Sequence, residues 1–323
     1  MAILSLKDVS VTYHSSDKEV HAINHITLDV EENESLGIVG ESGSGKTTLI
    51  MAILRLLNEK SSTVTGEALL EGEDLISMSP ERLSEIRWTK MAIVFQKAMN
   101  ALSPVHKIGH FISDLYRVHE PEASKEEVRR RIEECLELVN LPKRVFDLYP
   151  HELSGGMLQR VSIAMSLILD PKLLVMDEAT TALDVVTQNQ ILSEIMRLEE
   201  GRGITRIMIT HDMSVVATTC KKVAVLYAGS LMEVGPVEEV LVDPVHPYTR
   251  GLVDSFPTFT VDTHEPLKSI AGSLPDLANL PAGCVFAARC PKATEICFRE
   301  APEMKQYGPR HTAACHMAEE GRA

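Results

Sequence analysis

The chain has 323 residues, of which 24% are charged, 44% hydrophobic and 4% aromatic, and its formal net charge is −14. This apolar content can form a substantial core, so we expect two globular domains, or one large domain with an appendage. The acidic excess disfavours a protein whose main partner is a nucleic acid. No apolar run reaches the roughly 18 residues that cross a bilayer, and no export signal begins the chain, so a soluble cytoplasmic protein is predicted.

Short apolar runs alternate with helix-like stretches, which is typical of an α/β fold. Because the runs are apolar almost throughout, we predict parallel strands buried on both faces. The predicted strands are 35–40, 91–95, 173–177, 204–210 and 223–227. An insertion at about 100–169 interrupts the alternation, and its stretch Ser124–Leu138 begins with the Ser/Glu pattern of a capping box. We therefore predict an inserted helical subdomain.

Residues 40–48, here called the phosphate loop, read GESGSGKTT and match the P-loop pattern G-x-x-x-x-G-K-[ST]. The loop lies between an apolar strand and a helix, where glycines let backbone N–H groups face phosphates. Lys46 is expected to bridge the β- and γ-phosphates of ATP, and the Thr47 hydroxyl to ligate Mg²⁺. The predicted nucleotide-binding residues of this loop are Gly40, Glu41, Ser42, Gly43, Ser44, Gly45, Lys46, Thr47 and Thr48.

A second phosphate-related motif is LLVMDE at 173–178, an apolar strand that ends in two carboxylates. Asp177 is expected to hold Mg²⁺, and Glu178 to act as the general base that polarises the attacking water. An acidic strand end is a weak signal alone, but the phosphate loop in the same chain makes it specific.

The third motif, LSGGMLQ at 153–159, precedes a helix expected from Arg160 onward. A Ser-Gly-Gly turn at a helix N-terminus binds anions, so Ser154, Gly155 and Gly156 form a second candidate phosphate site. One chain then carries two phosphate-binding elements and only one P-loop. A head-to-tail dimer explains the second element, because in such a dimer the Ser-Gly-Gly turn of one subunit closes over the nucleotide that the other subunit holds.

Together these motifs resemble the nucleotide-binding subunits of ATP-binding cassette (ABC) proteins, over about residues 1–235. The resemblance implies a RecA-like core with an N-terminal antiparallel β part and the inserted helical subdomain, and it implies ATP hydrolysis. Ala179 departs from the family pattern, in which Pro often follows the glutamate, but no ligand is lost.

The same resemblance assigns roles to residues that are uninformative alone. Gln96 corresponds to the glutamine that senses Mg²⁺ and the membrane partner, and residues 182–184 to the D-loop. His211 corresponds to the switch histidine at the γ-phosphate, and Tyr13 to the aromatic residue stacked on adenine. Gln96 and His211 thus join Glu178 as expected catalytic residues, and Gln96 is also an expected Mg²⁺ ligand.

The segment 236–323 forms a loop-rich extension that holds ten of the 16 prolines and four of the six cysteines. The four are Cys284, Cys290, Cys297 and Cys315. Four thiolates in C-x5-C-x6-C-x17-C spacing suit a [4Fe–4S] cluster first and tetrahedral zinc second, since C-x2-C pairs are absent. Unmetallated thiols remain a third alternative, whereas disulfides do not fit a reducing compartment.

With HPYTRGLVDSFP at 246–257, the cysteines resemble the ATPase subunits of dipeptide and oligopeptide ABC importers. That resemblance implies a [4Fe–4S] cluster, a heterodimer with a second homologous ATPase, two membrane-spanning permeases, an extracytoplasmic solute-binding protein, and a peripheral position on the cytoplasmic face of the membrane. Oligosaccharides or other solutes are alternative cargoes. We expect the cluster to be structural and to leave nucleotide binding almost unchanged.

Two further expectations concern partners. A non-transport ABC ATPase of DNA repair or translation is the rival function, disfavoured by the negative charge and the single cassette. For transport, the segment 96–109 is expected to dock a short helix of a permease through Met99, Leu102 and Val105.

Overall fold

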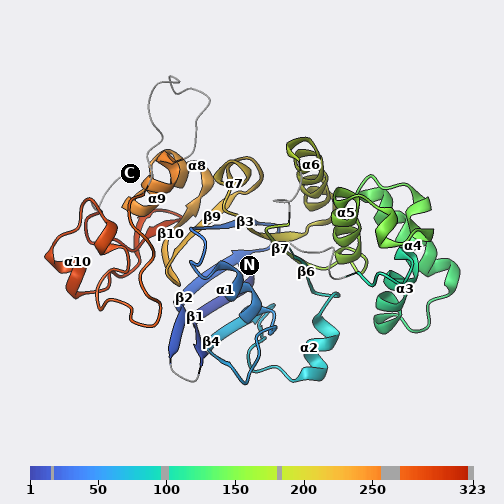
Figure 1. Ribbon diagram of the computed structural model, residues 1–323, viewed down its shortest axis with the longest axis horizontal. Coiled ribbons are helices and arrows are strands. Elements are labelled where there is room, and N and C mark those ends of the chain that lie inside the picture. The colour runs from blue at the N-terminus through green and yellow to red at the C-terminus, as the bar shows by residue number, and fades with distance from the viewer. Residues whose placement is uncertain (16–17, 96–101, 180–183, 256–269, 319–323) are drawn as a thin grey trace. The chain divides into compact units, whose positions relative to one another are not determined.

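The computed structural model describes residues 1–15, 18–95, 102–179, 184–255 and 270–318 (Figure 1). Contacts divide the chain into two units, 1–77 with 209–323 and 78–208, and we describe each unit by itself. The C-terminal extension belongs to the first unit, together with the N-terminal strands. The predicted boundary at 235 and the predicted subdomain at about 100–169 stay predictions.

The first unit begins with an antiparallel sheet whose strands follow the order β2-β1-β4-β5. The strands are β1 (Ala2–His14), β2 (Glu19–Glu31), β4 (Ser62–Leu70) and β5 (Glu73–Asp74). Along β2, buried Ile26, Leu28 and Val30 alternate with exposed side chains. This alternation gives the sheet one apolar face for the core and one face for water.

The other sheet of this unit runs in the order β11-β12-β10-β9-β3. The strands are β3 (Ser35–Val39), β9 (Lys222–Tyr227), β10 (Ser230–Pro236), β11 (Lys305–Gly308) and β12 (His311–Ala313). β3 and β9 are parallel, and nearly every residue in them is buried, as the apolar runs predict. The C-terminal extension supplies β11 and β12, which continue the sheet beyond β10.

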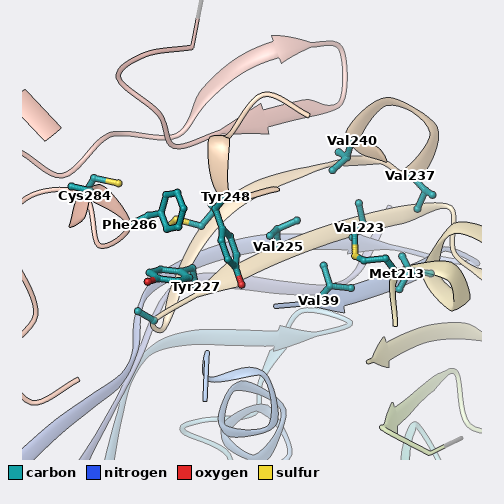
Figure 2. Packing of buried hydrophobic residues seen from close by; sticks show 14 of the residues in the cluster. Val39, Met213, Val223, Val225, Tyr227, Val237, Val240, Tyr248, Cys284 and Phe286 are labelled. Atoms are coloured by element: carbon teal, nitrogen blue, oxygen red, sulfur yellow. The ribbon is translucent and has the colours of Figure 1, made fainter. Parts of the chain in front are cut away.

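Helices and one short 3₁₀ turn cover these strands. They are α1 (Lys46–Ile53), α7 (Met213–Thr219), α8 (Val237–Val242), α9 (Pro247–Asp254), η4 (Ala287–Arg289) and α10 (Glu295–Arg299). One core cluster joins Val39 of β3 and Tyr227 of β9 to Tyr248 of α9 and to Cys284 and Phe286 of the extension (Figure 2). The cysteine-rich segment is therefore part of this unit's core.

The second unit contains the strands β6 (Met91–Phe95), β7 (Leu173–Asp177) and β8 (Thr205–Ile209), in the order β8-β7-β6, and β8 ends one residue past the unit boundary. Its helices are α2 (Pro80–Ile86), α3 (Ile108–His119), α4 (Lys125–Leu138), α5 (Gly155–Ser166) and α6 (Val185–Arg202), with 3₁₀ turns η2 (Lys143–Asp147) and η3 (Pro150–Glu152). Ser124 is the N-cap of α4, and both bonds of the capping box are present.

The strands predicted from the sequence are confirmed to within one residue at each end. The expected start of the helix after the signature motif is wrong, because α5 begins at Gly155 and not at Arg160. The Ser154 side chain accepts the Met157 N–H and so caps the helix five residues earlier. Within the described parts of the chain, no helix is both long and apolar enough to cross a membrane.

Candidate nucleotide site and four-cysteine site

The phosphate loop joins β3 to α1, and two of its glycines are required by the backbone. Gly40 has φ +152°, and a Cβ there would lie 2.1 Å from the Leu226 carbonyl oxygen. Gly45 has φ +100°, and its Cβ would lie 2.6 Å from the Ala22 oxygen. No L side chain fits either position, so the glycine pattern of the P-loop fixes a tightly curled backbone.

Lys46 is the first residue of α1, and its side chain turns back into the loop. Its ammonium donates to the carbonyl oxygens of Gly40 and Glu41, each at 2.8 Å, and to Ser44 Oγ at 3.3 Å. Only 6% of Lys46 is exposed. The curled loop thus concentrates a positive charge at the start of a helix, where the helix dipole also favours an anion.

The remaining predicted residues of this loop surround that charge. Ser42, Gly43 and Thr47 are exposed, as a bound phosphate and metal would require. Tyr13 of β1 donates through its hydroxyl to Thr48 Oγ1 at 3.4 Å. The structure thus brings the predicted adenine-stacking residue next to the phosphate loop.

His211 belongs to the same unit as the phosphate loop and is exposed. It follows β8, and the neighbouring Thr210 donates its N–H to the Ile38 carbonyl oxygen at 3.3 Å. Asp212, on the other side, caps α7 by accepting the Ser214 N–H. The histidine therefore lies just past the end of β8, and its neighbour Thr210 is bonded to β3, the strand that leads into the phosphate loop.

Two of the predicted motifs lie in the second unit. Asp177 ends β7 with 7% of its surface exposed, and Glu178 follows with φ +47°. A non-glycine residue at positive φ stores backbone strain, which proteins retain mainly where function requires the side-chain direction. Ser154 caps α5, and both Ser154 and Gly155 are exposed, so the start of the signature turn is accessible to a ligand.

Some predicted residues fall outside the part of the chain that the structure describes. These are Gln96, Met99 and the D-loop residues Ala182 and Leu183. Asp184 at the end of the D-loop is described, and it caps α6 through the Thr187 N–H. That bond is the main reason that the pKa of Asp184 is lowered.

The four cysteines of the extension are reduced thiols that lie within electrostatic range of one another. The pKa of Cys284 is raised to about 11, chiefly by burial, and charge on Cys297, Cys315 or Cys290 acts in the same direction. Burial also raises the pKa of Cys290 and of Cys315. Cys284 donates its N–H to the Cys297 carbonyl at 2.8 Å, which fixes two of the four side by side. Among the described residues, no group of three metal-binding side chains is close enough to hold a single ion.

A buried polar cluster fastens the extension to β10. Glu233, with no exposed surface, accepts the N–H groups of Val245 at 2.8 Å and His246 at 2.9 Å. His311 of β12 places its Nε2 2.7 Å from Glu233 Oε1 and its Nδ1 3.5 Å from Glu239 Oε2. Burial lowers the pKa of His246 to about 4, despite the nearby Glu233.

The sequence did not indicate the residues that contact Glu41 of the phosphate loop. Arg289 of η4 pairs with its carboxylate, and the Tyr248 hydroxyl accepts its N–H at 2.9 Å. These contacts join residues more than 200 positions apart. Tyr248 stands in the HPY motif, and Arg289 directly precedes a predicted cysteine ligand, which are the only sequence signals that point to them.

The sheets, the phosphate loop and the acidic strand end define an ABC-type ATPase cassette. Known proteins agree, because the ABC transporter family profile matches residues 23–181 and that of the oligopeptide/dipeptide transporter C-terminal region matches residues 232–297. A bacterial ABC transporter cassette solved as a dimer superposes with a TM-score of 0.66 and 31% identity, over 72% of this chain and 98% of that chain.

Two curated relatives are similar over nearly their whole length. A probable peptide ABC transporter ATP-binding protein of Sinorhizobium fredii is 40% identical over 321 residues, covering 98% of this chain and 96% of that protein. The oligopeptide transport ATP-binding protein OppD of Bacillus subtilis is 42% identical over 313 residues, covering 96% and 87%. The chain therefore belongs to the ATP-binding subunits of ABC transporters of the oligopeptide/dipeptide importer type. Such subunits hydrolyse ATP to drive transport and attach peripherally to the membrane.

Proposed function

We propose that this ATPase drives uptake of dipeptides or oligopeptides. The observation that carries the proposal is the match of residues 232–297 to the peptide-transporter C-terminal region, in addition to the cassette itself. We further propose that the subunit pairs head to tail with a second homologous ATPase beneath two permeases, which receive solute from an extracytoplasmic binding protein. The exposed signature turn of a chain that already has its own phosphate loop supports this pairing.

Within each ATP site of that dimer, the residues of this chain take distinct roles. Lys46 holds the β- and γ-phosphates, and Tyr13 stacks on adenine. Thr47, Asp177 and Gln96 hold Mg²⁺, which when bound neutralises phosphate charge. Ser154, Gly155 and Gly156 bind the γ-phosphate of the nucleotide held by the partner subunit. The backbone N–H groups of the phosphate loop wrap the phosphates.

The general base for ATP hydrolysis is the carboxylate of Glu178, which follows β7. Glu178 accepts a proton from water, whose oxygen attacks the γ-phosphorus, and the bond from that phosphorus to the bridging oxygen breaks. The products are ADP and inorganic phosphate, and the proton passes from Glu178 to solvent. His211 contacts the γ-phosphate, so that its side chain distinguishes ATP from ADP.

Transport of peptides is tested in vesicles that contain the complete importer. Peptide-loaded binding protein should stimulate ATP hydrolysis and accumulate labelled dipeptide or oligopeptide inside the vesicles. Stimulation by an oligosaccharide with no response to peptides would replace the peptide assignment with another solute. Stimulation by DNA or RNA in place of the permeases would overturn the transport function.

We also propose that the four cysteines bind a [4Fe–4S] cluster. Four cysteines without disulfide bonds lie in one segment, three of them buried and Cys290 partly buried, which fits a group that takes one thiolate on each of four irons. One zinc ion would draw its sulfur ligands to within about 3.8 Å of one another, given Zn–S bonds of about 2.3 Å. A [4Fe–4S] cluster is larger than one zinc ion, so its four cysteine sulfurs can lie farther apart. This favours the cluster over zinc at the four-cysteine site.

Metal analysis of anaerobically purified protein decides between the two. The cluster requires about four irons with matching sulfide and broad absorbance near 400 nm. Cys290→Ser should lower the iron content, whereas Cys220→Ala, at a cysteine packed in the core, should retain it. One zinc per chain without sulfide would identify the site as a zinc site instead.

We propose a docking surface for a permease helix at residues 102–109. This is the described part of the segment 96–109 that the sequence indicates. Val105 is 74% exposed and can contact a partner, but Leu102 is only 5% exposed. The expected contact through Leu102 is therefore wrong, because that side chain is already buried within this chain. Cross-linking from Val105→Cys to the permease loops should succeed, and its failure in every nucleotide state would remove this surface.

A further inference from the structure

The segment that precedes Cys290 reaches the phosphate loop through one ion pair. Arg289 donates from Nη1 to Glu41 Oε2 at 2.9 Å and from Nη2 to Glu41 Oε1 at 3.0 Å. Its side chain is 7% exposed, and that of Glu41 is 27% exposed. This is a bidentate, largely buried pair, the geometry in which arginine binds a carboxylate most specifically.

Every N–H donor of the Arg289 guanidinium has an acceptor. Besides the two bonds to Glu41, Nη1 donates to the Tyr227 hydroxyl at 3.1 Å, Nη2 to the Ile270 carbonyl at 3.1 Å, and Nε to the Ala271 carbonyl at 2.8 Å. A guanidinium has five such donors, and all five are used. The group is therefore fixed in place before any nucleotide arrives.

Aromatic rings and a backbone turn support the same guanidinium. It lies 5.5 Å from the Tyr227 ring centre and 5.9 Å from that of Phe286, two residues of the core cluster in Figure 2. Arg289 donates its N–H to the Phe286 carbonyl at 3.0 Å, and the next residue, Cys290, donates to Ala287 at 3.2 Å. The position of Arg289 is thus set by the same turn that carries a cysteine of the four-cysteine site.

Glu41 is an anion inside the loop that binds a triphosphate. Its carbonyl oxygen accepts from Lys46 Nζ at 2.8 Å and from the Ser44 N–H at 3.1 Å, so its backbone belongs to the phosphate-binding structure. An uncompensated carboxylate at this place would repel the phosphates, because like charges a few ångströms apart interact unfavourably in a partly buried site. Arg289 cancels that charge.

We propose that Arg289 is a positioning residue that neutralises Glu41, and that the state of the four-cysteine site thereby sets the affinity of the phosphate loop for ATP. The second half rests on the proposed cluster, and the first half does not. This proposal departs from the sequence-based expectation that the cluster leaves nucleotide binding almost unchanged, and the direct contact between Arg289 and Glu41 is the reason.

The test measures MgATP affinity of the full chain by calorimetry. Arg289→Met, which leaves Glu41 charged and unpaired, should weaken binding about tenfold, and Arg289→Lys about threefold, since lysine keeps the charge but not the fork. Adding Glu41→Gln to Arg289→Met should restore most of the loss. Arg250→Met, which removes the Arg250–Asp243 ion pair at the extension's surface, is the matched control and should change binding less than about twofold.

Several results would overturn the neutralising role. One is wild-type affinity in a folded Arg289→Met variant, and another is a double variant as weak as the single one. If Arg289→Met does not fold, Glu41→Gln alone decides, because neutralisation predicts about twofold tighter binding and weaker binding contradicts it. In the assembled importer, Arg289→Met should raise KM for ATP about tenfold while kcat changes less than about twofold.

The link to the cysteines has its own measurement. Removal of iron by oxidant and chelator should weaken ATP binding about fivefold in the wild-type chain and not in the Arg289→Met, Glu41→Gln double variant. Equal loss in both chains would overturn the link. Wild-type protein without iron would overturn the proposed cluster and its effect on ATP, whereas the Arg289 variants would still decide the neutralising role. Wild-type protein that does not bind ATP would instead contradict the ATPase assignment.

Discussion

The phosphate loop and the signature turn are the two proposed phosphate-binding elements of the chain, and they differ in the charge and the fixed backbone that each one provides. The phosphate loop has glycines at positive φ, a buried lysine and a carboxylate held by the C-terminal extension. The signature turn has an exposed capping serine, two glycines and no cation between 154 and 159. A site with its own charge and fixed backbone can bind a nucleotide alone, whereas a bare helix N-terminus needs a ligand that another subunit presents.

Replacing Glu178 should have the largest effect, because neither device supplies a proton acceptor. We expect Glu178→Gln to lower ATP turnover by roughly 10²–10⁴-fold while ATP binding persists, since general-base catalysis typically contributes that much. Single-turnover hydrolysis in the assembled importer is the measurement. A turnover close to that of the wild type would remove Glu178 from its role.

Lys46 carries the charge that distinguishes the phosphate loop from the signature turn. Lys46→Ala should weaken MgATP binding by about 10²-fold, because it removes a charge-assisted contact with the triphosphate. Equilibrium binding to the isolated chain measures this. Lys7→Ala, at an exposed strand lysine paired with Glu67, is the control and should bind ATP normally. If both variants bind equally well, the phosphate loop is not the nucleotide site.

Ser154 tests the dependence of the signature turn on a partner. Ser154→Ala should lower hydrolysis by the assembled dimer about tenfold, since it removes a hydroxyl at the phosphate and a helix cap worth about 1 kcal/mol. The affinity of the isolated subunit for ATP should stay close to that of the wild type. Ser193→Ala, at an exposed serine of α6, is the control. An equal loss of ATP binding in the isolated subunit would contradict the head-to-tail arrangement.

The folding stability that the C-terminal extension contributes should decrease in mild acid. Burial keeps the pKa of His246 at about 4, below its unfolded value of 6.5, so the unfolded chain binds the extra proton between these values. Stability is complete above about pH 6.5 and falls by up to about 3 kcal/mol as the pH drops toward 4. The titratable group facing His246 is Glu233.

His246→Asn isolates that contribution, because asparagine can still cap α9 but does not titrate. Chemical denaturation at several pH values gives the free energy of unfolding. Between pH 6.5 and 4 this free energy should change less with pH in the variant than in the wild type. Identical slopes would show that His246 does not control this transition.

The sequence predicted the local features well and the long-range contacts poorly. The buried strands, the capping box at Ser124 and the curled phosphate loop follow from composition and spacing over a few residues. The pairing of Arg289 with Glu41 spans 248 positions, and no periodicity encodes it. The strands β11 and β12 were also missed, because three or four residues of mixed polarity carry no strand pattern.

The pairing of β12 with β10 also has a consequence for biosynthesis. Glu233 lies opposite Ala313 and Val234 opposite Thr312, so the outer edge of β10 gains its partner only after residue 313 has been synthesised. Until then the nascent chain exposes unpaired backbone donors and acceptors, and the Glu233 carboxylate lacks its contact with His311. Premature termination before β12 should therefore produce an aggregation-prone product, in which the outer edge of β10 stays unpaired.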